Sequence, residues 1–205
     1  RNGVTGAKLA VQLHVEDCKA DDEALGVALR QLARVEANLK RFLELGRGES
    51  LRREPGSLSA LVGEAVELLR PQCRHVGIDL QWRPPEADCT LIGDPVQLGH
   101  LFLNVIGNAV EAAGPGGAVE IRLIMEQGRP ATVEVWDTGP GPSPEVAERL
   151  FEPFVTGKRE GVGLGLAVAR QAAEAHGGRM SWRREAGRTC FVIELPLGEG
   201  SERRA

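Results

Sequence analysis

Long apolar runs are missing from this sequence. No stretch approaches the roughly 18 residues that a membrane-spanning helix needs, and no signal peptide opens the chain. The 205 residues therefore predict no membrane span, and any anchor would have to lie upstream of Arg1. A strong charge imbalance is missing too, because the formal net charge is only −4. This argues against nucleic acid or an anionic membrane as a partner, and we expect a cytoplasmic location.

Metal-site and disulfide signatures are also missing. Cys18, Cys73, Cys89 and Cys190 lie far apart and form no CxxC pair. They predict reduced, mostly buried thiols and not a disulfide framework or a zinc site. The four histidines have no metal-ligand spacing, and the Walker A phosphate motif is absent. What remains is an ordinary soluble composition, 42% apolar and 26% charged, with enough apolar side chains for a core.

Proline is absent from residues 1–46, and this segment has a helical pattern. Leu25, Leu32 and Leu39 recur every seven residues with charged residues between them, which predicts a long helix in a bundle. The residues before this seam are also apolar with a helical period. We expect a helical hairpin that forms a homodimeric four-helix bundle. Packing of the hairpin against the second domain of its own chain is the alternative.

Residues 47–56 are charged and rich in glycine and proline, and they predict a linker. Mixed patterns follow over residues 57–197, including the helix-starting pair Asp94-Pro95. We expect an α+β two-layer sandwich, a mixed sheet covered by helices, and a disordered polar tail at 198–205. The expected elements are helices near 58–73, 95–113 and 164–176, and strands near 78–82, 119–125, 131–136, 179–184 and 189–195.

Two asparagines stand out in the expected helix 95–113. Asn104 and Asn108 are four residues apart, so both amides project from one helix face. An amide oxygen suits Mg²⁺ that takes its other ligands from phosphates and water. Taken alone, paired asparagines on a helix are more often surface residues or caps. Their apolar neighbours indicate a largely buried helix, in which both amides would need partners.

A second motif begins at Asp137, where an apolar strand enters the sequence Thr-Gly-Pro-Gly. A carboxylate there can accept a hydrogen bond from the exocyclic amine of a base, and the glycines let the backbone approach a flat ring closely. A plain turn is the alternative reading of these residues.

Two further segments follow, LFEPF at 150–154 and EGVGLGL at 160–166. The second is similar to a glycine-rich phosphate loop that opens a helix. It does not fit a dinucleotide-binding fold, because no acidic residue on a second strand follows at the required distance. Lys158 and Arg159 lie just before this loop, on a segment expected to be a flexible lid, where they could reach terminal phosphates. Solvated loop charges are the alternative.

In this order, the segments NVIGNAVEA, DTGPG, LFEPFVTGK and GVGLGLAVAR resemble the N, G1, F and G2 boxes of histidine kinase ATP-binding domains. These belong to the wider gyrase, chaperone and mismatch-repair ATPase superfamily. The resemblance covers residues 57–197 and implies a Bergerat-type fold that binds ATP with Mg²⁺. It also implies transfer of the γ-phosphoryl group to a histidine and then to an aspartate on a response-regulator receiver domain.

The resemblance assigns roles to individual residues. Asn108 would be the Mg²⁺ ligand, Asp137 the acceptor for the adenine amine, and Lys158 would lie near the γ-phosphate. Thr189 matches a position that contacts adenine through water, and His176 fits a helix-ending, structural position. The remaining implied ATP contacts are Gly139, Gly141, Phe154, Gly161, Val162, Gly163, Leu164 and Gly165.

Asn104 separates the branches of the superfamily. In the hydrolysing members this position carries a glutamate that activates water, whereas an amide cannot accept a proton at neutral pH. Asn104 therefore implies a site that positions ATP for phosphoryl transfer and avoids hydrolysis. Two alternatives stay open: an ATPase that uses ATP as a conformational clamp, and a scaffold with a degenerate ATP site.

The resemblance makes residues 1–46 the dimerisation and phosphoacceptor hairpin, yet the expected histidine is missing. The family carries it in a pattern close to His-Glu-x-Arg-Asn-Pro, which no histidine of this chain matches. Arg1-Asn2-Gly3 resembles the end of that pattern, which puts the phosphoacceptor three residues before Arg1. Asn2 would then help orient water for dephosphorylation of the regulator. The rivals are a degenerate kinase without an acceptor and a kinase that phosphorylates a separate histidine domain.

Overall fold

The computed structural model describes residues 52–85, 89–158 and 162–197. The chain divides into compact units at residues 1–49 and 50–205, and all described residues belong to the second unit. The predicted hairpin and tail therefore lie outside the described residues, as do Asn2, Cys18, Arg159 and Gly161. The predicted homodimer stays a prediction.

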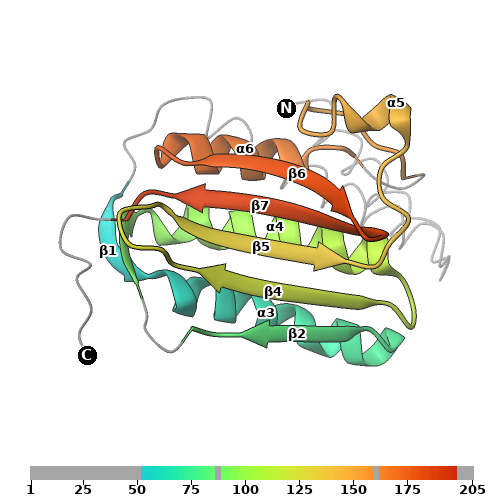
Figure 1. Ribbon diagram of the computed structural model, residues 1–205, viewed down its shortest axis with the longest axis horizontal. Coiled ribbons are helices and arrows are strands. Elements are labelled where there is room, and N and C mark those ends of the chain that lie inside the picture. The colour runs from blue at the N-terminus through green and yellow to red at the C-terminus, as the bar shows by residue number, and fades with distance from the viewer. Residues whose placement is uncertain (1–51, 86–88, 159–161, 198–205) are drawn as a thin grey trace, which may run out of the picture. The chain divides into compact units, whose positions relative to one another are not determined.

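A mixed five-stranded sheet forms one layer of the domain (Figure 1). Its strand order is β2-β4-β5-β7-β6, and only β2 and β4 run parallel, while the other neighbours are antiparallel. The strands are β2 (Asp79–Arg83), β4 (Ala118–Ile124), β5 (Ala131–Asp137), β6 (Arg179–Glu185) and β7 (Arg188–Leu195). A small separate sheet pairs β1 (Glu54–Ser57) antiparallel with β3 (Thr90–Gly93).

Helices form the second layer, behind the sheet in the view of Figure 1. They are α3 (Leu58–Val76), α4 (Pro95–Ala113) and α6 (Gly165–Ala175), and a short helix α5 (Pro144–Ala147) lies in the loop after β5. α4 packs between α3 and α6 and also contacts β4 and β5. The predicted two-layer α+β sandwich is confirmed for the described residues.

The central helix α4 forms where local signals predict it. Asp94 caps its N-terminus, because its Oδ1 accepts hydrogen bonds from the backbone N–H groups of Val96 (3.0 Å) and Gln97 (3.1 Å). Pro95 occupies the first helical position, and Gly114 ends the helix at a positive φ of 66°. The core face is apolar and consists of Leu98, Leu101, Phe102, Val105, Ile106, Ala109 and Val110. The side of α4 toward the sheet is therefore held by buried apolar contacts.

Three short elements differ from the sequence-based expectation. Residues 54–56, expected to be linker, lie in β1 because the backbone there pairs with β3. β3 and α5 have only four residues each, too few for a periodic pattern to mark them. These segments depend on pairing or on a local turn and not on amphipathic repeats.

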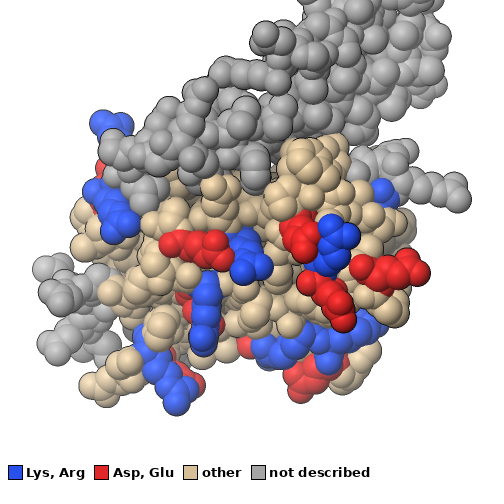
Figure 2. All heavy atoms as spheres, turned by 90° about the horizontal axis from the view of Figure 1, so that it is seen from above, with Lys and Arg blue, Asp and Glu red and all other residues tan. Residues whose placement is uncertain are grey.

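The described cysteines are buried, as predicted, and none of Cys73, Cys89 and Cys190 is in a disulfide. Burial raises the pKa of the Cys190 thiol to about 12, which keeps it protonated at neutral pH. No helix among the described residues is long and apolar enough to cross a membrane. Acidic and basic side chains are interspersed on the face seen in Figure 2.

Gly93 is a position where a side chain does not fit. A methyl group there would lie 2.7–2.8 Å from side-chain atoms of Leu98, His176 and Leu91. We expect Gly93→Ala to lower the free energy of unfolding by about 1–3 kcal/mol through overpacking. Urea denaturation should show the loss. Gly99→Ala is the matched control, since nothing lies within 4 Å of the added methyl and alanine favours helix by about 0.5–1 kcal/mol. Equal shifts in the two variants would contradict the prediction.

Candidate functional site

The two asparagines of α4 lie on the face that meets the start of α6. Asn104 has a buried Nδ2 without a hydrogen-bond partner. Gly165, the first residue of α6, lies so close that a Cβ there would be 3.5 Å from Asn104 Oδ1. An unpartnered buried amide nitrogen is uncommon in a folded domain. The packing of α6 on α4 therefore brings the glycine loop against a polar group that lacks a partner within the described protein.

The carboxylate at the end of β5 has one oxygen with a hydrogen-bond partner and one oxygen without. Asp137 is only 1% exposed, and its Oδ1 accepts a 2.8 Å hydrogen bond from the backbone N–H of Gly139. Its Oδ2 is buried without a hydrogen-bond partner. Burial raises the pKa of Asp137, and this outweighs the opposing effects of the Gly139 N–H and the nearby positive charge of Arg184. Asp137 Oδ2 is therefore a buried hydrogen-bond acceptor to which no group of the described protein donates.

The turn after Asp137, residues 137–141, packs directly on α4. A Cβ at Gly139 would overlap the backbone of Ala112, one helical turn beyond Asn108. Gly141 has a positive φ of 78°, which favours glycine. These contacts bring Asp137 and Asn108, far apart in the sequence, to the same region of the fold.

Thr189 lies beside Asp137. The two residues are paired in the register of β5 and β7, and Thr189 is 2% exposed. Its Oγ1 accepts a 2.9 Å hydrogen bond from Arg184 Nη1, which also donates to the Gly139 carbonyl at 3.3 Å. Arg184 thus ties β6 to this turn. No motif in the sequence marked Arg184, because its contacts depend on strand pairing.

The Lys158 side chain forms hydrogen bonds with two residues of α4. Its Nζ donates to Asn108 Oδ1 at 2.8 Å and to Glu111 Oε2 at 2.9 Å. A cation therefore already occupies the oxygen that is expected to bind Mg²⁺. Sequence reasoning placed Lys158 near the γ-phosphate and overlooked Glu111. Glu111 lies three residues after Asn108 and therefore on the same face of the helix, and this spacing could have marked it as a site residue.

The phenylalanine segment and the glycine loop are joined by their backbones. The N–H of Phe154 donates to the carbonyl of Gly163 at 2.9 Å, and both residues have positive φ angles, 66° and 71°. A Cβ at Gly163 would lie 2.6–2.8 Å from the backbone of residues 154 and 155. Phe154 itself is 64% exposed, whereas Leu164 is buried and Val162 half-buried. The loop thus requires glycine at position 163.

The residues present fit ATP and Mg²⁺. Within the described parts of the chain, no group of three or more His, Cys, Asp or Glu residues could hold a metal ion. A magnesium ion would therefore depend on the amide oxygen of Asn108, on phosphate oxygens and on water, which suits its chemistry. The unpartnered oxygen of Asp137 suits an amine donor.

Comparison with known proteins identifies a family that includes this region. Residues 93–199 match the family described as histidine kinase-, DNA gyrase B- and HSP90-like ATPase. The chain belongs to this family. The matched residues run from the start of α4 past the end of β7, so they include every described position of the candidate site.

Individual relatives in the family include histidine kinases. Sporulation kinase A of Bacillus subtilis is 33% identical over 199 residues, which are 96% of this chain and 32% of that protein. The catalytic domain of histidine kinase ThkA matches with a TM-score of 0.63 and 28% identity, over 71% of this chain and 96% of that one. ThkA in complex with the response regulator TrrA matches with a TM-score of 0.74 and 25% identity, over 95% of this chain and 57% of that one. The chain spans about a third of the length of the first curated relatives it matches.

Proposed function

We propose that this protein is an ATP-dependent protein-histidine kinase of a two-component signalling system. One observation carries the proposal: the contact between Gly139 and Ala112 brings the unpartnered buried oxygen of Asp137 and the cation-binding oxygen of Asn108 to the same region of the fold. The first suits the adenine amine and the second suits Mg²⁺ on the phosphates. Membership of the family supports binding of ATP at this place.

The chain's own residues would then perform distinct tasks. Asp137 orients the base, Asn108 holds the metal, and Lys158 exchanges its bonds to Asn108 and Glu111 for the γ-phosphate. Mg²⁺, when bound, neutralises phosphate charge. Asn104 cannot take a proton from water, so the site favours an external nucleophile over hydrolysis. The remaining contacts to ATP are proposed for Thr189 and for the loop residues Phe154, Gly161, Val162, Gly163, Leu164 and Gly165.

The proposed reaction has two transfers. In the first, the bond between the γ-phosphorus and the oxygen of ADP breaks as a bond to a histidine nitrogen forms, and the imidazole releases its N–H proton. In the second, the phosphoryl group passes to a carboxylate oxygen of a response-regulator aspartate and the histidine is regenerated. The solved complex of ThkA with a response regulator supports a partner of this class.

The remaining parts of the proposal concern residues outside the described region. We propose a cytoplasmic homodimer formed through residues 1–46, with Asn2 near the regulator.

Labelled ATP tests the proposal directly. The 205-residue chain is mixed with a longer version that carries upstream residues and the inactivating change Asp137→Asn, and γ-labelled ATP with Mg²⁺ is added. We expect acid-labile, alkali-stable phosphate to appear on the longer chain only, without fast steady-state ATP hydrolysis. Fast hydrolysis without transfer would point to an ATPase clamp, and failure to bind ATP would point to a scaffold. Phosphate on His14 would contradict the upstream acceptor.

A further inference from the structure

His176 joins the C-terminal end of α6 to the N-terminal end of α4. The ring is buried, 6% exposed, and its Nε2 lies 2.9 Å from the backbone N–H of Asp94. Its Nδ1 lies 2.7 Å from the carbonyl oxygen of Ala172. A backbone N–H can only donate and a carbonyl can only accept, so Nε2 carries the lone pair and Nδ1 the proton. Both ring nitrogens are thereby used by the backbone of two helices.

No residue larger than glycine fits beside the His176 ring at position 93. Gly93 precedes Asp94, and a Cβ there would lie 2.8 Å from His176 Cδ2. Glycine at position 93 therefore lets the ring approach the start of α4 closely enough for the 2.9 Å hydrogen bond. The hydrogen bond between His176 and Asp94 is therefore a specific contact that requires glycine at position 93.

Arg52 and Arg53, which precede β1, form hydrogen bonds at these same ends of α4 and α6. The backbone N–H of Arg52 donates to Asp94 Oδ2 at 3.2 Å, and Arg53 Nη2 donates to the carbonyl of Ala175 at 3.2 Å. Arg53 thus binds the C-terminal end of α6, where a positive charge is favourable. We refer to Arg52, Arg53, Asp94 and His176 as the α4–α6 junction.

The other end of the same helix pair is the candidate nucleotide site. α4 and α6 are packed together, and the first residue of α6, Gly165, contacts Asn104 in the middle of α4. Asn104 lies ten residues beyond Asp94, which is about 15 Å along a helix. Closely packed helices transmit displacement with little compression. A change of register at the junction therefore moves Asn104 and Asn108 relative to the glycine loop.

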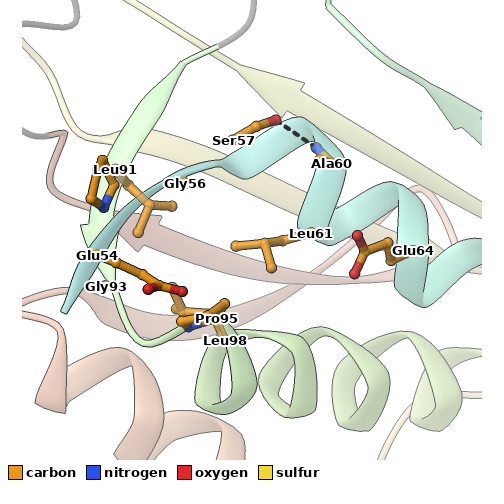
Figure 3. A pocket seen from close by; sticks show the side chains of 11 residues that line it. Glu54, Gly56, Ser57, Ala60, Leu61, Glu64, Leu91, Gly93, Pro95 and Leu98 are labelled. Atoms are coloured by element: carbon orange, nitrogen blue, oxygen red, sulfur yellow. Dashed lines mark hydrogen bonds between the residues drawn. The ribbon is translucent and has the colours of Figure 1, made fainter. Parts of the chain in front are cut away.

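One side of the first turn of α4 is not filled by side chains. A pocket of about 180 Å³ lies between this turn, β1 and α3, and Figure 3 shows Pro95 and Leu98 at its edge opposite Leu61 and Glu64. The pocket is lined by residues of β1, β3, α3 and the first turn of α4. None of the residues assigned to ATP lines it. On this side the hydrogen bonds of the junction add to the apolar packing that positions α4.

We propose that His176 is a positioning residue of the nucleotide site, which fixes α4 against α6, and that Arg53 acts on the site through the same junction. The inference rests on the proposed nucleotide site. It does not depend on whether the phosphoryl group goes to histidine. His176 touches neither nucleotide nor metal in this proposal.

Two substitutions separate positioning from simple filling of space. His176→Phe keeps a ring of similar volume without the acceptor, whereas the amide oxygen of His176→Gln can still accept from the Asp94 N–H. Binding of a fluorescent ATP analogue with Mg²⁺ is measured, and urea denaturation confirms that each variant is folded. We expect His176→Phe to weaken binding about tenfold, the size of one lost hydrogen bond, and His176→Gln to recover it to within about threefold. A fully folded His176→Phe that binds like the parent chain would overturn the proposal, as would failure of His176→Gln to restore binding.

A double-mutant cycle tests the part played by Arg53. Arg53→Ala should weaken analogue binding about threefold in the parent chain and have no further effect in His176→Phe. Additive effects would refute coupling through the junction. Asp137→Asn serves as the reference for the site itself. If that variant also binds normally, the proposed nucleotide site fails; if it alone loses binding, only the role of His176 fails.

Discussion

Asp137→Asn is expected to weaken binding of an ATP analogue by at least about 100-fold while leaving the domain as stable as before or more stable. The asparagine oxygen can still accept from the Gly139 N–H, so its NH₂ group takes the place of the oxygen that has no partner. Two donors would then face each other at the adenine amine, a mismatch worth about 3 kcal/mol. A buried neutral amide costs less than a buried carboxylate, so the free energy of unfolding should rise by up to about 1 kcal/mol. Fluorescence titration and urea denaturation measure the two effects.

Glu134→Gln is the matched control on the same strand. Glu134 is also buried, but it points to the other sheet face, where Arg183 binds it at 2.7 Å and Trp136 Nε1 at 2.9 Å. Burial alone would raise its pKa, yet the hydrogen bonds from Arg183 and Trp136 lower it. We expect this variant to lose about 1–3 kcal/mol of stability and to bind the analogue normally. Loss of binding in both variants would show that the effect of Asp137→Asn is not specific to the site.

The two carboxylates also predict opposite responses to pH. The pKa of Asp137 is raised in the folded protein, so its burial costs stability at neutral pH, and this cost disappears as the pH falls through the folded pKa. The pKa of Glu134 is lowered, so its contribution is present above the unfolded pKa and is lost as the pH falls through the folded value. Protonation of Asp137 also removes an acceptor. Analogue affinity should therefore decline on acidification before the Glu134 contribution is lost.

Asn108→Ala is expected to remove the dependence of nucleotide binding on Mg²⁺. In the parent chain, EDTA should weaken binding of the analogue by about 100-fold, because in the proposed site the metal links Asn108 to the phosphates. Asn108→Ala in Mg²⁺ should bind no more tightly than the parent chain in EDTA, and EDTA should change its affinity little. Lys158 keeps Glu111 as a partner in this variant, so the loss does not arise from a free lysine alone. Titrations with and without EDTA measure the ratio.

Gln171→Ala provides the control for loss of an amide. Gln171 lies on α6 and has a buried Oε1 without a hydrogen-bond partner, yet it belongs to no predicted contact with ATP. It should keep both the affinity and the response to EDTA. Asp137→Asn provides a second comparison, because its residual binding should still respond to Mg²⁺. If Asn108→Ala responds to EDTA as strongly as the parent chain, Asn108 is not the metal ligand.

Much of the fold was predictable because its signals are local. The span of α4 follows from a cap at Asp94, a proline at the first position and a glycine stop, all within the helix or next to it. Strands β4 and β5 follow from alternating side chains and from burial of one or both faces. The strand pair β1–β3 has no such signal, because each partner stabilises the other across 32 or more intervening residues.

The candidate site divides in the same way. Asn104, Asn108 and Asp137 were predicted because each has its motif within a few residues of sequence. Glu111 and Arg184 were missed, since they acquire their roles from Lys158 and from the turn after β5. The position of Lys158 was predicted only in part: its place just before the glycine loop is local, but its partners come from α4.

By itself, the sequence determined which chemical groups are available and in which order they occur: amides on a helix, a carboxylate at a strand end, and a glycine loop before a second helix. Only the tertiary structure decided which of their atoms are satisfied. It left Asp137 Oδ2 and Asn104 Nδ2 without partners, placed a lysine on Asn108, and joined His176 to Asp94. The reason is physical, because a hydrogen bond depends on distances of about 3 Å between atoms, and packing sets those distances between residues far apart in the chain.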